Sequence, residues 1–286
     1  MQAGAAEAAA RLTGGLVTGT RPLGGAAYEV RMGDGGRLVA KGHGDPNAVR
    51  AEAASLAWLA AAGTVRVPEL KGYTADWLVT DYVTSGSPST KAAAELGRGL
   101  AGLHAAGAPA FGSPPPDGPA DASIGLAPMR NVGCPGWPEF YGAYRVEPYL
   151  RTAVDSGAYS SAEARVFDEV IERLPELAGP PEPPARLHGD LWSGNVLWAA
   201  DGHAWLVDPA AHGGHRETDL AMLQLFGCPH LDTILAAYDE AAPLSAGWRE
   251  RVPLHQLFPL LVHTVLFGGG YARQAAQAAR VALRAG

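Results

Sequence analysis

The chain has 286 residues, of which 47% are hydrophobic and 18% are charged. This composition is typical of a folded globular protein and excludes a largely disordered chain. The formal net charge of −7 argues against non-specific binding to nucleic acid, because counterion release requires clusters of Lys and Arg. We therefore expect a small-molecule partner and no nucleic-acid partner, while the oligomeric state stays open.

Three further features of the sequence concern its compartment. Cys134 and Cys228 are the only cysteines, and their wide separation predicts two free thiols, whose role stays open, instead of a zinc site or a disulfide framework. Residues 1–10 lack the basic region and long apolar stretch of a secretory signal, so we expect a cytoplasmic protein. Polar residues and a proline interrupt the apolar segment 252–267, which predicts a buried helix and no membrane span.

The first third of the chain contains four short strand-like runs separated by glycine-rich turns. These runs are residues 16–22, 27–32, 37–41 and 77–83. Gly24 and Gly25 follow the first run, and a Gly-Asp-Gly-Gly segment joins the second run to the third. Hairpin turns with positive φ favour such residues. The pattern predicts a small antiparallel sheet.

One helix interrupts this series of strands. It is predicted over residues 46–62, and Gly63 fits the position after its C-terminus. Glu52 falls on the same face as the apolar Val49, so its carboxylate is expected to face the sheet. A buried carboxylate needs a partner, and Lys41 at the end of the preceding strand is the candidate. The alternative is a solvated glutamate on an alanine-rich helix.

From about residue 90 the sequence becomes mainly helical. Leucines at positions 96, 100 and 103 form the stripe of a core helix that ends near Gly107. Further helices are predicted at residues 138–156, 161–177, 219–225, 231–241 and from 254 to the end. Segments 108–119 and 179–184 are rich in Pro and Gly and are predicted to be exposed loops.

Residues 84–89 have the Ser-, Gly- and Pro-rich composition of a connector between the two parts. We therefore expect an α+β protein with an N-terminal lobe over residues 1–84 and a C-terminal lobe over residues 85–286. The first lobe is predicted to contain the small sheet, and the second is predicted to be mainly helical.

Two aspartates and an asparagine surround two short apolar segments late in the chain. Asp190 and Asn195 lie five residues apart in a glycine-containing loop, and Asp208 follows thirteen residues after Asn195. Carboxylate and amide oxygens suit Mg²⁺, which usually takes one or two carboxylates together with phosphate oxygens. The remaining carboxylate is then free to orient a substrate hydroxyl. The set predicts phosphoryl transfer from ATP, although singly Asp190 could cap a turn and Asp208 could end a strand.

Several motifs around these residues resemble those of the fructosamine/ketosamine kinase family, which is related to the aminoglycoside phosphotransferases. The most specific is Leu-His-Gly-Asp-Leu-Trp-Ser-Gly-Asn at residues 187–195. The others are Val-Asp-Pro-Ala at 207–210, Gly-Gly-His-Arg-Glu-Thr-Asp-Leu-Ala-Met at 213–222, Leu-Phe-Gly at 225–227 and Trp-Pro-Glu-Phe-Tyr at 137–141. The resemblance covers nearly the whole chain and implies a two-lobed, protein-kinase-like fold.

The resemblance also implies roles for the residues of the catalytic segments. Asp190 would act as the base, Asn195 and Asp208 as magnesium ligands, and Lys41 with Glu52 as the pair that positions the ATP phosphates. The implied reaction moves the γ-phosphoryl group of ATP to the 3-hydroxyl of a 1-amino-1-deoxyketose such as a fructosamine or ribulosamine.

Adenine would dock at Asp81, Tyr82 and Val83, where the lobes join. The phosphate-covering loop departs from the kinase pattern, because it has two glycines and no Gly-x-Gly-x-x-Gly. Backbone contact between phosphate and Gly24 or Gly25 is still expected.

Five residues in or near the catalytic segments are candidates for the acceptor pocket, namely Trp192, His212, His215, Arg216 and Glu217. Arg216 and Glu217 could equally form a structural ion pair, and Asp219 is expected to cap a helix. Two other functions stay open: a kinase for an aminoglycoside, choline or another metabolite, and a nucleotide-binding module without turnover. Whether the acceptor amine belongs to a free amino acid or to a protein also stays open.

Overall fold

The first part of the chain forms a five-stranded antiparallel sheet with the strand order β1-β2-β3-β5-β4. The computed structural model describes residues 1–285. The strands are β1 (Val17–Gly24), β2 (Ala27–Met32), β3 (Arg37–Gly42), β4 (Leu70–Tyr73) and β5 (Trp77–Asp81). The four predicted strands are confirmed. Strand β4 was not predicted, because Leu-Lys-Gly-Tyr shows no alternation of apolar and polar residues.

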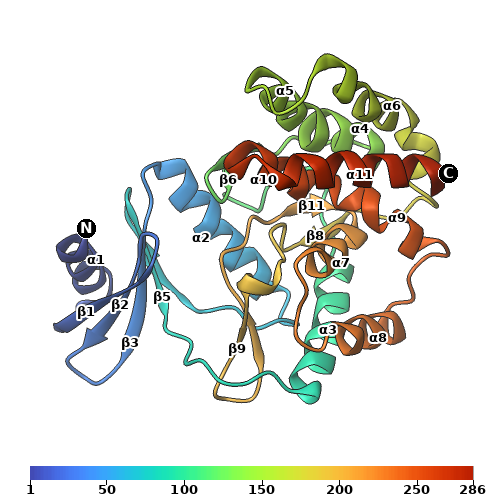
Figure 1. Ribbon diagram of the computed structural model, residues 1–286. Coiled ribbons are helices and arrows are strands. Elements are labelled where there is room, and N and C mark those ends of the chain that lie inside the picture. Colours follow the sequence, from blue (N-terminus) through green and yellow to red (C-terminus); the bar gives the residue numbers. More distant parts are fainter. Residues whose placement is uncertain (286) are drawn as a thin grey trace.

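Two helices cover opposite faces of this sheet (Figure 1). Helix α2 (Pro46–Ala61) confirms the prediction; Asp45 caps its N-terminus. Helix α1 (Gln2–Thr13) was not predicted, because its alanines give little amphipathic contrast, yet they pack closely on the sheet. Val79 of β5 packs with α1, whereas its neighbour Leu78 packs with α2. Successive residues of a strand point to opposite faces, so the sheet is buried on both sides.

The second part is mainly helical, as predicted. Its helices are α3 (Thr90–Ala105), α4 (Trp137–Tyr141), α5 (Glu147–Asp155), α6 (Ser161–Leu177), α7 (Arg216–Leu225), α8 (Leu231–Ala241), α9 (Trp248–His255), α10 (Leu257–Phe267) and α11 (Gly270–Ala285). Figure 1 shows α10 and α11 together on one side of this part and α3 with α8 on another. The buried residues of α10 confirm the helix predicted within segment 252–267.

Two predicted helices are in fact interrupted. A π-helical turn, Gly142–Val146, separates α4 from α5; Pro148 lies in the first turn of α5 and cannot donate a main-chain hydrogen bond. The helix predicted from residue 254 to the end is three helices. Gly268 and Gly269 separate the last two with φ values of +65° and +58°, which are incompatible with a continuous right-handed helix.

The second part also contains three short antiparallel pairs of strands. Strand β8 (Ala185–Leu187) pairs with β11 (His212–Gly214), and β9 (Val196–Trp198) pairs with β10 (Ala204–Leu206). The third pair, β6 (Asp121–Ile124) with β7 (Ala127–Arg130), was not predicted. Its turn contains Gly125 at φ +55°. The first two pairs fix the ends of the loops that contain Asp190 and Asp208.

Both cysteines are free thiols, as expected. Among residues 1–285, none of the helices has both the length and the hydropathy that a membrane span requires.

Candidate active site

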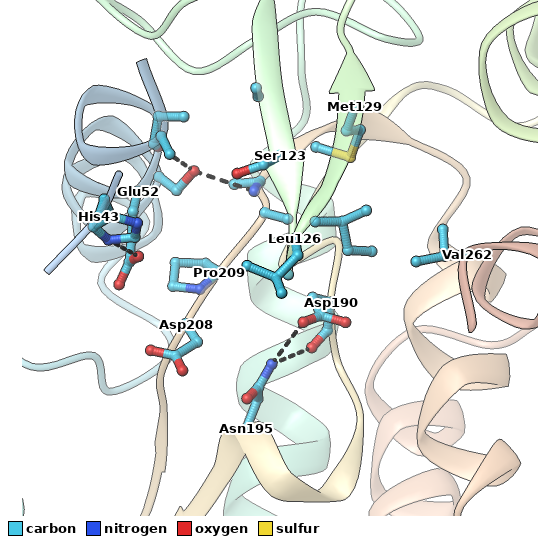
Figure 2. Close-up of a pocket in the computed structure, with 18 of the residues that line it drawn as sticks. His43, Glu52, Ser123, Leu126, Met129, Asp190, Asn195, Asp208, Pro209 and Val262 are labelled. Carbon is cyan, nitrogen blue, oxygen red and sulfur yellow. Dashed lines mark hydrogen bonds and ion pairs between the residues drawn. The ribbon is translucent and has the colours of Figure 1, made fainter. Parts of the chain in front are cut away.

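A cavity of about 410 Å³ opens between α2, the sheet and the helical part. Its walls come from β3, α2, the loops after β8 and β10, the β6–β7 hairpin and α10. Figure 2 shows Glu52 and His43 on one side, Asp190 and Asn195 below, and Val262 of α10 on the other side. Residues from distant parts of the sequence therefore surround one space.

Asp190 and Asn195 form one hydrogen-bonded unit in the loop after β8. The side-chain nitrogen of Asn195 donates to the main-chain oxygen of Asp190 at 2.8 Å and to its carboxylate at 3.0 Å. The amide oxygen of Asn195 is left as an acceptor or metal ligand. Burial raises the pKa of Asp190 to about 6, although the hydrogen bond from Asn195 opposes this shift. The five-residue spacing in the sequence thus corresponds to direct contact.

Lys41 lies between two carboxylates at the edge of the cavity. Its Nζ is 2.9 Å from Oε2 of Glu52 and 3.0 Å from Oδ1 of Asp208. Nε2 of His43 is 3.0 Å from the same Glu52 oxygen. Burial alone would raise the pKa of Glu52, but Lys41 and His43 lower it. Burial alone would lower the pKa of Lys41, but the two carboxylates raise it. The inward orientation of Glu52 and its pairing with Lys41 are confirmed, and the solvated alternative is wrong.

The backbone is specialised where the loop after β8 meets the loop after β10. Gly189 has a φ of +84°, and a Cβ added there would lie 2.0 Å from the carbonyl oxygen of Ala210, so only glycine fits. Asp208 has a φ of +53°, a left-handed conformation that costs a non-glycine residue energy and is concentrated at functional sites. Its side chain is 51% exposed and lines the cavity.

Asp219 supports the loop that contains Asp190, a role that the sequence did not reveal. Its carboxylate is buried and accepts hydrogen bonds from the main-chain N–H groups of His188 at 2.7 Å and Gly189 at 3.0 Å. Nε2 of His104 lies 3.2 Å from the same carboxylate. The expectation that Asp219 caps a helix is wrong, because His215 is the N-cap of α7. No local pattern could reveal partners that lie about 30 residues upstream.

Four of the five residues predicted for the acceptor pocket lie away from the cavity. His212, His215 and Glu217 are buried within the helical part, and Arg216 pairs with Glu182 instead. An arginine of α9 holds Glu217. Both residues do form structural ion pairs, but not with each other: Arg216 pairs with Glu182 and Glu217 pairs with Arg251. The prediction that these four side chains line the acceptor pocket is therefore wrong, because they are buried or paired outside the cavity.

Trp192 is the fifth of these residues, and it does line the cavity. Its side chain is half-exposed, and its ring meets the edge of Phe226 at a centroid distance of 6.1 Å. A Cβ added at Gly194 would lie 2.2 Å from the Trp192 ring. The glycine of the Trp-Ser-Gly-Asn motif thus leaves space for the indole.

The glycines of the predicted phosphate loop form the turn between β1 and β2. Gly24 and Gly25 have φ values of +135° and +53°, which favour glycine. Neither residue lines the cavity, although the next residue, Ala26, does. The turn is therefore adjacent to the cavity without forming its wall.

The predicted adenine-docking segment leaves the sheet at the end of β5, and its three residues do not line the cavity. The carboxylate of Asp81 lies 3.1 Å from Lys71, and the guanidinium of Arg37 lies 4.2 Å from the centre of the Tyr82 ring. Val83 leads into residues 84–86, which pair with the chain at 198–200. These contacts connect the sheet to the β9–β10 hairpin.

The buried groups beneath the site predict a fold that is sensitive to acid. Burial lowers the pKa of His212 and His215 from an ordinary value of 6.5 to about 3. Burial alone would raise the pKa of Glu217 from 4.5, but His255 and Arg251 lower it to about 2. All three groups take up a proton at higher pH in the unfolded chain than in the folded protein. Their stabilising contribution is therefore fully present above pH 6.5 and is lost as the pH falls toward 3.

Thermal unfolding measured as a function of pH tests this expectation. The unfolding temperature should be nearly constant above about pH 7 and should fall continuously below it. An unfolding temperature that rises on acidification from neutral pH would contradict the assignment.

Comparisons with known proteins place the chain in a family. The family model described as Fructosamine kinase matches residues 38–285. A protein of Enterococcus faecium assigned as a ketoamine kinase is 34% identical over 218 residues, which cover 74% of this chain and 76% of that protein. The family match begins in β3 and continues through the rest of the sheet and the helical part.

Two solved structures extend the comparison. A protein from Thermobifida fusca YX-ER1 assigned as a fructosamine-3-kinase is 45% identical, with a TM-score of 0.92 over 99% of both chains. A choline kinase from Streptococcus pneumoniae shares the fold, with a TM-score of 0.65 over 94% of both chains, at 17% identity. The fold is therefore that of the protein-kinase-like small-molecule kinases, and the chain belongs to the fructosamine kinase family of phosphotransferases.

Proposed function

We propose that this protein is an ATP-dependent ketosamine kinase that phosphorylates the 3-hydroxyl of a 1-amino-1-deoxyketose. Membership of the fructosamine kinase family supports the reaction class. The observation that carries the proposal is the position of Lys41, within 3.0 Å of both Glu52 and Asp208, at the same cavity as the Asp190–Asn195 unit. This arrangement combines a group that attracts phosphate with a carboxylate that can accept a hydroxyl proton.

Asp190 is our candidate for the general base. Its carboxylate is buried at the cavity, and Asn195 fixes its orientation. A pKa of about 6 lies close to neutral pH, where a general base combines availability with basicity. Asp190 is therefore suited to orient the acceptor hydroxyl and to take its proton as the phosphoryl group is transferred.

Asn195 and Asp208 are our candidates for holding Mg²⁺. The free amide oxygen of Asn195 and the exposed carboxylate of Asp208 are hard oxygen donors at one cavity, which fits this ion. Bound Mg²⁺ would neutralise charge on the nucleotide phosphates. Lys41, oriented by Glu52, would attract the same phosphates.

The remaining nucleotide contacts are assigned to residues outside the group formed by Lys41, Asp190, Asn195 and Asp208. We assign Gly24 and Gly25 to the loop that approaches the phosphates and Asp81, Tyr82 and Val83 to the adenine-docking segment. Residues 1–84 would then form the nucleotide-binding lobe, and the chain from residue 85 the catalytic and acceptor lobe. Trp192, which lines the cavity, is our candidate for a surface on which the sugar rests.

Replacement of Asp208 by alanine tests the metal assignment. The variant is expected to bind ATP more weakly in the presence of Mg²⁺ and to lose the strengthening that Mg²⁺ gives to the wild type, because one of two oxygen ligands is removed. Calorimetry of ATP binding with and without Mg²⁺ measures this difference. Retention of the full Mg²⁺ dependence would contradict the role of Asp208.

A substrate panel tests the function itself. Fructosyl, ribulosyl and erythrulosyl amines, aminoglycosides and choline are each offered with ATP, and ADP release is followed. Turnover is expected with the ketosamines. The fold is shared with a choline kinase, so the main alternative is a kinase for another metabolite. Turnover confined to aminoglycosides or choline would reject the ketosamine assignment, and ATP binding without turnover of any acceptor would favour a binding module.

A further inference from the structure

Helix α2 belongs to two hydrophobic cores at once. Leu56 packs with Leu78 of the sheet, whereas Trp58 and Leu59, near the C-terminus of the same helix, pack in the core of the helical part. Figure 1 shows α2 between the sheet and this part. Because protein interiors are close-packed, neither core can shift relative to the other without disturbing α2. The helix that contains Glu52 is therefore a bridge between the two parts.

A hydrogen bond joins the middle of this helix to the segment that follows Asp208. The main-chain N–H of Ala211 donates to Oγ of Ser55 at 3.2 Å, and the Ser55 hydroxyl donates to the main-chain oxygen of Ala51 at 2.7 Å. Ser55 and Ala211 are each 2% exposed, so water has little access to this bond. The Ser55 hydroxyl therefore uses its proton within α2 and an oxygen lone pair between the two parts of the chain.

The bond lies close to two residues of the candidate site. Ser55 is three positions after Glu52, and Ala211 is three positions after Asp208. Residues three apart on a helix are neighbours on its surface, and Ser55 and Glu52 both line the cavity. The bond thus ties the turn of α2 that contains Glu52 to the segment that contains Asp208.

The segment that contains Asp208 needs such ties, because its backbone is strained. Asp208 has a φ of +53°, and a strained conformation persists only where the surrounding structure fixes it. The main-chain N–H groups of Val207 and Ala210 donate to the loop that contains Asp190, and the N–H of Ala211 donates to α2. The first two bonds therefore fix Asp208 relative to Asp190, and the third fixes it relative to α2.

The direct contact between Lys41 and Asp208 is less suited to this task during the reaction. In the proposed function Lys41 attracts the ATP phosphates and Asp208 holds Mg²⁺, so both charges would be shared with the nucleotide and its metal. The hydrogen bond between Ser55 and Ala211 uses neither charged group. It therefore stays available when Lys41 and Asp208 are engaged.

We propose that Ser55 is a positioning residue for phosphoryl transfer. Its hydroxyl holds α2, and with it the Glu52–Lys41 pair, in the place relative to Asp208 that the transfer requires. Ser55 acts through these residues and not by contact with the reacting atoms. This inference rests on the proposed kinase function and adds to it a residue that no charge or catalytic motif marks.

Ser55→Ala tests this role, because it removes the hydroxyl and leaves the buried N–H of Ala211 without its acceptor. The kcat for ketosamine phosphorylation is expected to fall roughly 10- to 100-fold, since a misplacement of about 1 Å by a mutation away from the chemistry can cost roughly 100-fold. The KM for the acceptor and the affinity for ATP without Mg²⁺ should change little, because Lys41 and Glu52 move together.

Three measurements follow these quantities. A coupled assay for ADP release gives kcat and KM, and calorimetry without Mg²⁺ gives the affinity for ATP. NMR of amide hydrogen exchange reports on the bond itself in the absence of any ligand. Exchange at the Ala211 amide should be faster in Ser55→Ala than in the wild type, because the amide has lost its buried acceptor.

Two further variants separate positioning from loss of stability. Ser55→Thr keeps a hydroxyl that can bond the carbonyl four residues earlier, and it should recover most of the wild-type kcat. Thr264→Val is the matched control. Thr264 is 3% exposed, and its hydroxyl donates to Leu260 within α10 at 2.8 Å, but it does not line the cavity. This control loses a buried hydroxyl and should keep the wild-type kcat, while thermal unfolding compares the stabilities of the variants.

The outcomes separate this inference from the function on which it rests. Wild-type kcat in Ser55→Ala would overturn the inference while leaving a ketosamine kinase. Equal losses of kcat in Ser55→Ala and Thr264→Val would also overturn it, because the effect would then be one of stability. The same holds for a Ser55→Thr protein that is as slow as Ser55→Ala at the wild-type unfolding temperature.

Two other results concern the substrates. A change confined to the KM for the acceptor would overturn the inference, because Ser55 would then contact the acceptor. If the wild type phosphorylates another acceptor and no ketosamine, the proposed function fails, and the same variants test Ser55 with that acceptor. If it phosphorylates no acceptor at all, the inference fails together with the proposed function.

Discussion

The Asp190→Asn variant is expected to bind ATP normally and to lose roughly 10²- to 10⁴-fold in kcat, the usual contribution of a general base. Asparagine has the same shape as aspartate and keeps an oxygen that can accept the hydrogen bond from Asn195, so the loop should hold its conformation. What the variant lacks is the ability to take the hydroxyl proton. A coupled assay for ADP release measures kcat, and calorimetry measures ATP binding.

Asp155→Asn is the matched control for this experiment. Asp155 is exposed at the end of α5, far in the sequence from the loops that contain Asp190 and Asp208, and the same chemical change there should leave kcat unaltered. Normal turnover in Asp190→Asn would exclude Asp190 as the base. Loss of ATP binding in step with turnover would instead mean that Asp190 acts on the nucleotide.

The Asp219→Ala variant is expected to lower the free energy of unfolding by about 3–5 kcal/mol, the cost of removing one partner from a buried charged group. The change leaves two main-chain N–H groups, at His188 and Gly189, without their acceptor, and it removes the partner of His104. For a chain of this size, the unfolding temperature should fall by roughly 10 °C. Denaturant titration and calorimetric melting measure the two quantities.

The same variant should also lose activity in its folded fraction. His188 and Gly189 immediately precede Asp190, and their main-chain positions depend on the Asp219 carboxylate. Asp155→Ala again serves as the exposed control and should change stability by no more than about 0.5 kcal/mol. An Asp219→Ala protein with the wild-type unfolding temperature would show that the loop does not depend on this carboxylate.

The segments that contain the candidate catalytic residues could be predicted because these residues lie within short runs of sequence. Asp190 and Asn195 are close in the chain, and their hydrogen bond follows from one loop. The pairing of Lys41 with Glu52 was also predictable, because a strand and the next helix place them on facing surfaces. The contact between Lys41 and Asp208 joins segments 167 positions apart (208 minus 41) and had no signal in local spacing.

The residues of the acceptor pocket could not be predicted from the sequence in this way. Its prediction relied on closeness in sequence to the catalytic motifs, and four of its five side chains are in fact buried or paired away from the cavity. Apolar side chains that do line the cavity come from a hairpin and a helix that carry none of these motifs, including Leu126 and Phe267. Proximity along the chain gives no information about which face of a helix or hairpin a residue occupies after packing.

The sequence by itself therefore determined the fold class, four of the five strands of the first sheet, most of the helices and the family, and it singled out Asp190, Asn195 and Asp208 as candidates for the transfer chemistry. These depend on local periodicity, on turn residues and on spacings within one loop, which act over a few residues. Only the tertiary structure decided the support of the loop by Asp219, the position of Lys41 between two carboxylates and the apolar side of the cavity that the β6–β7 hairpin and α10 form. Each arises from packing between elements distant in the chain, and that packing minimises the free energy of the whole molecule instead of any one segment.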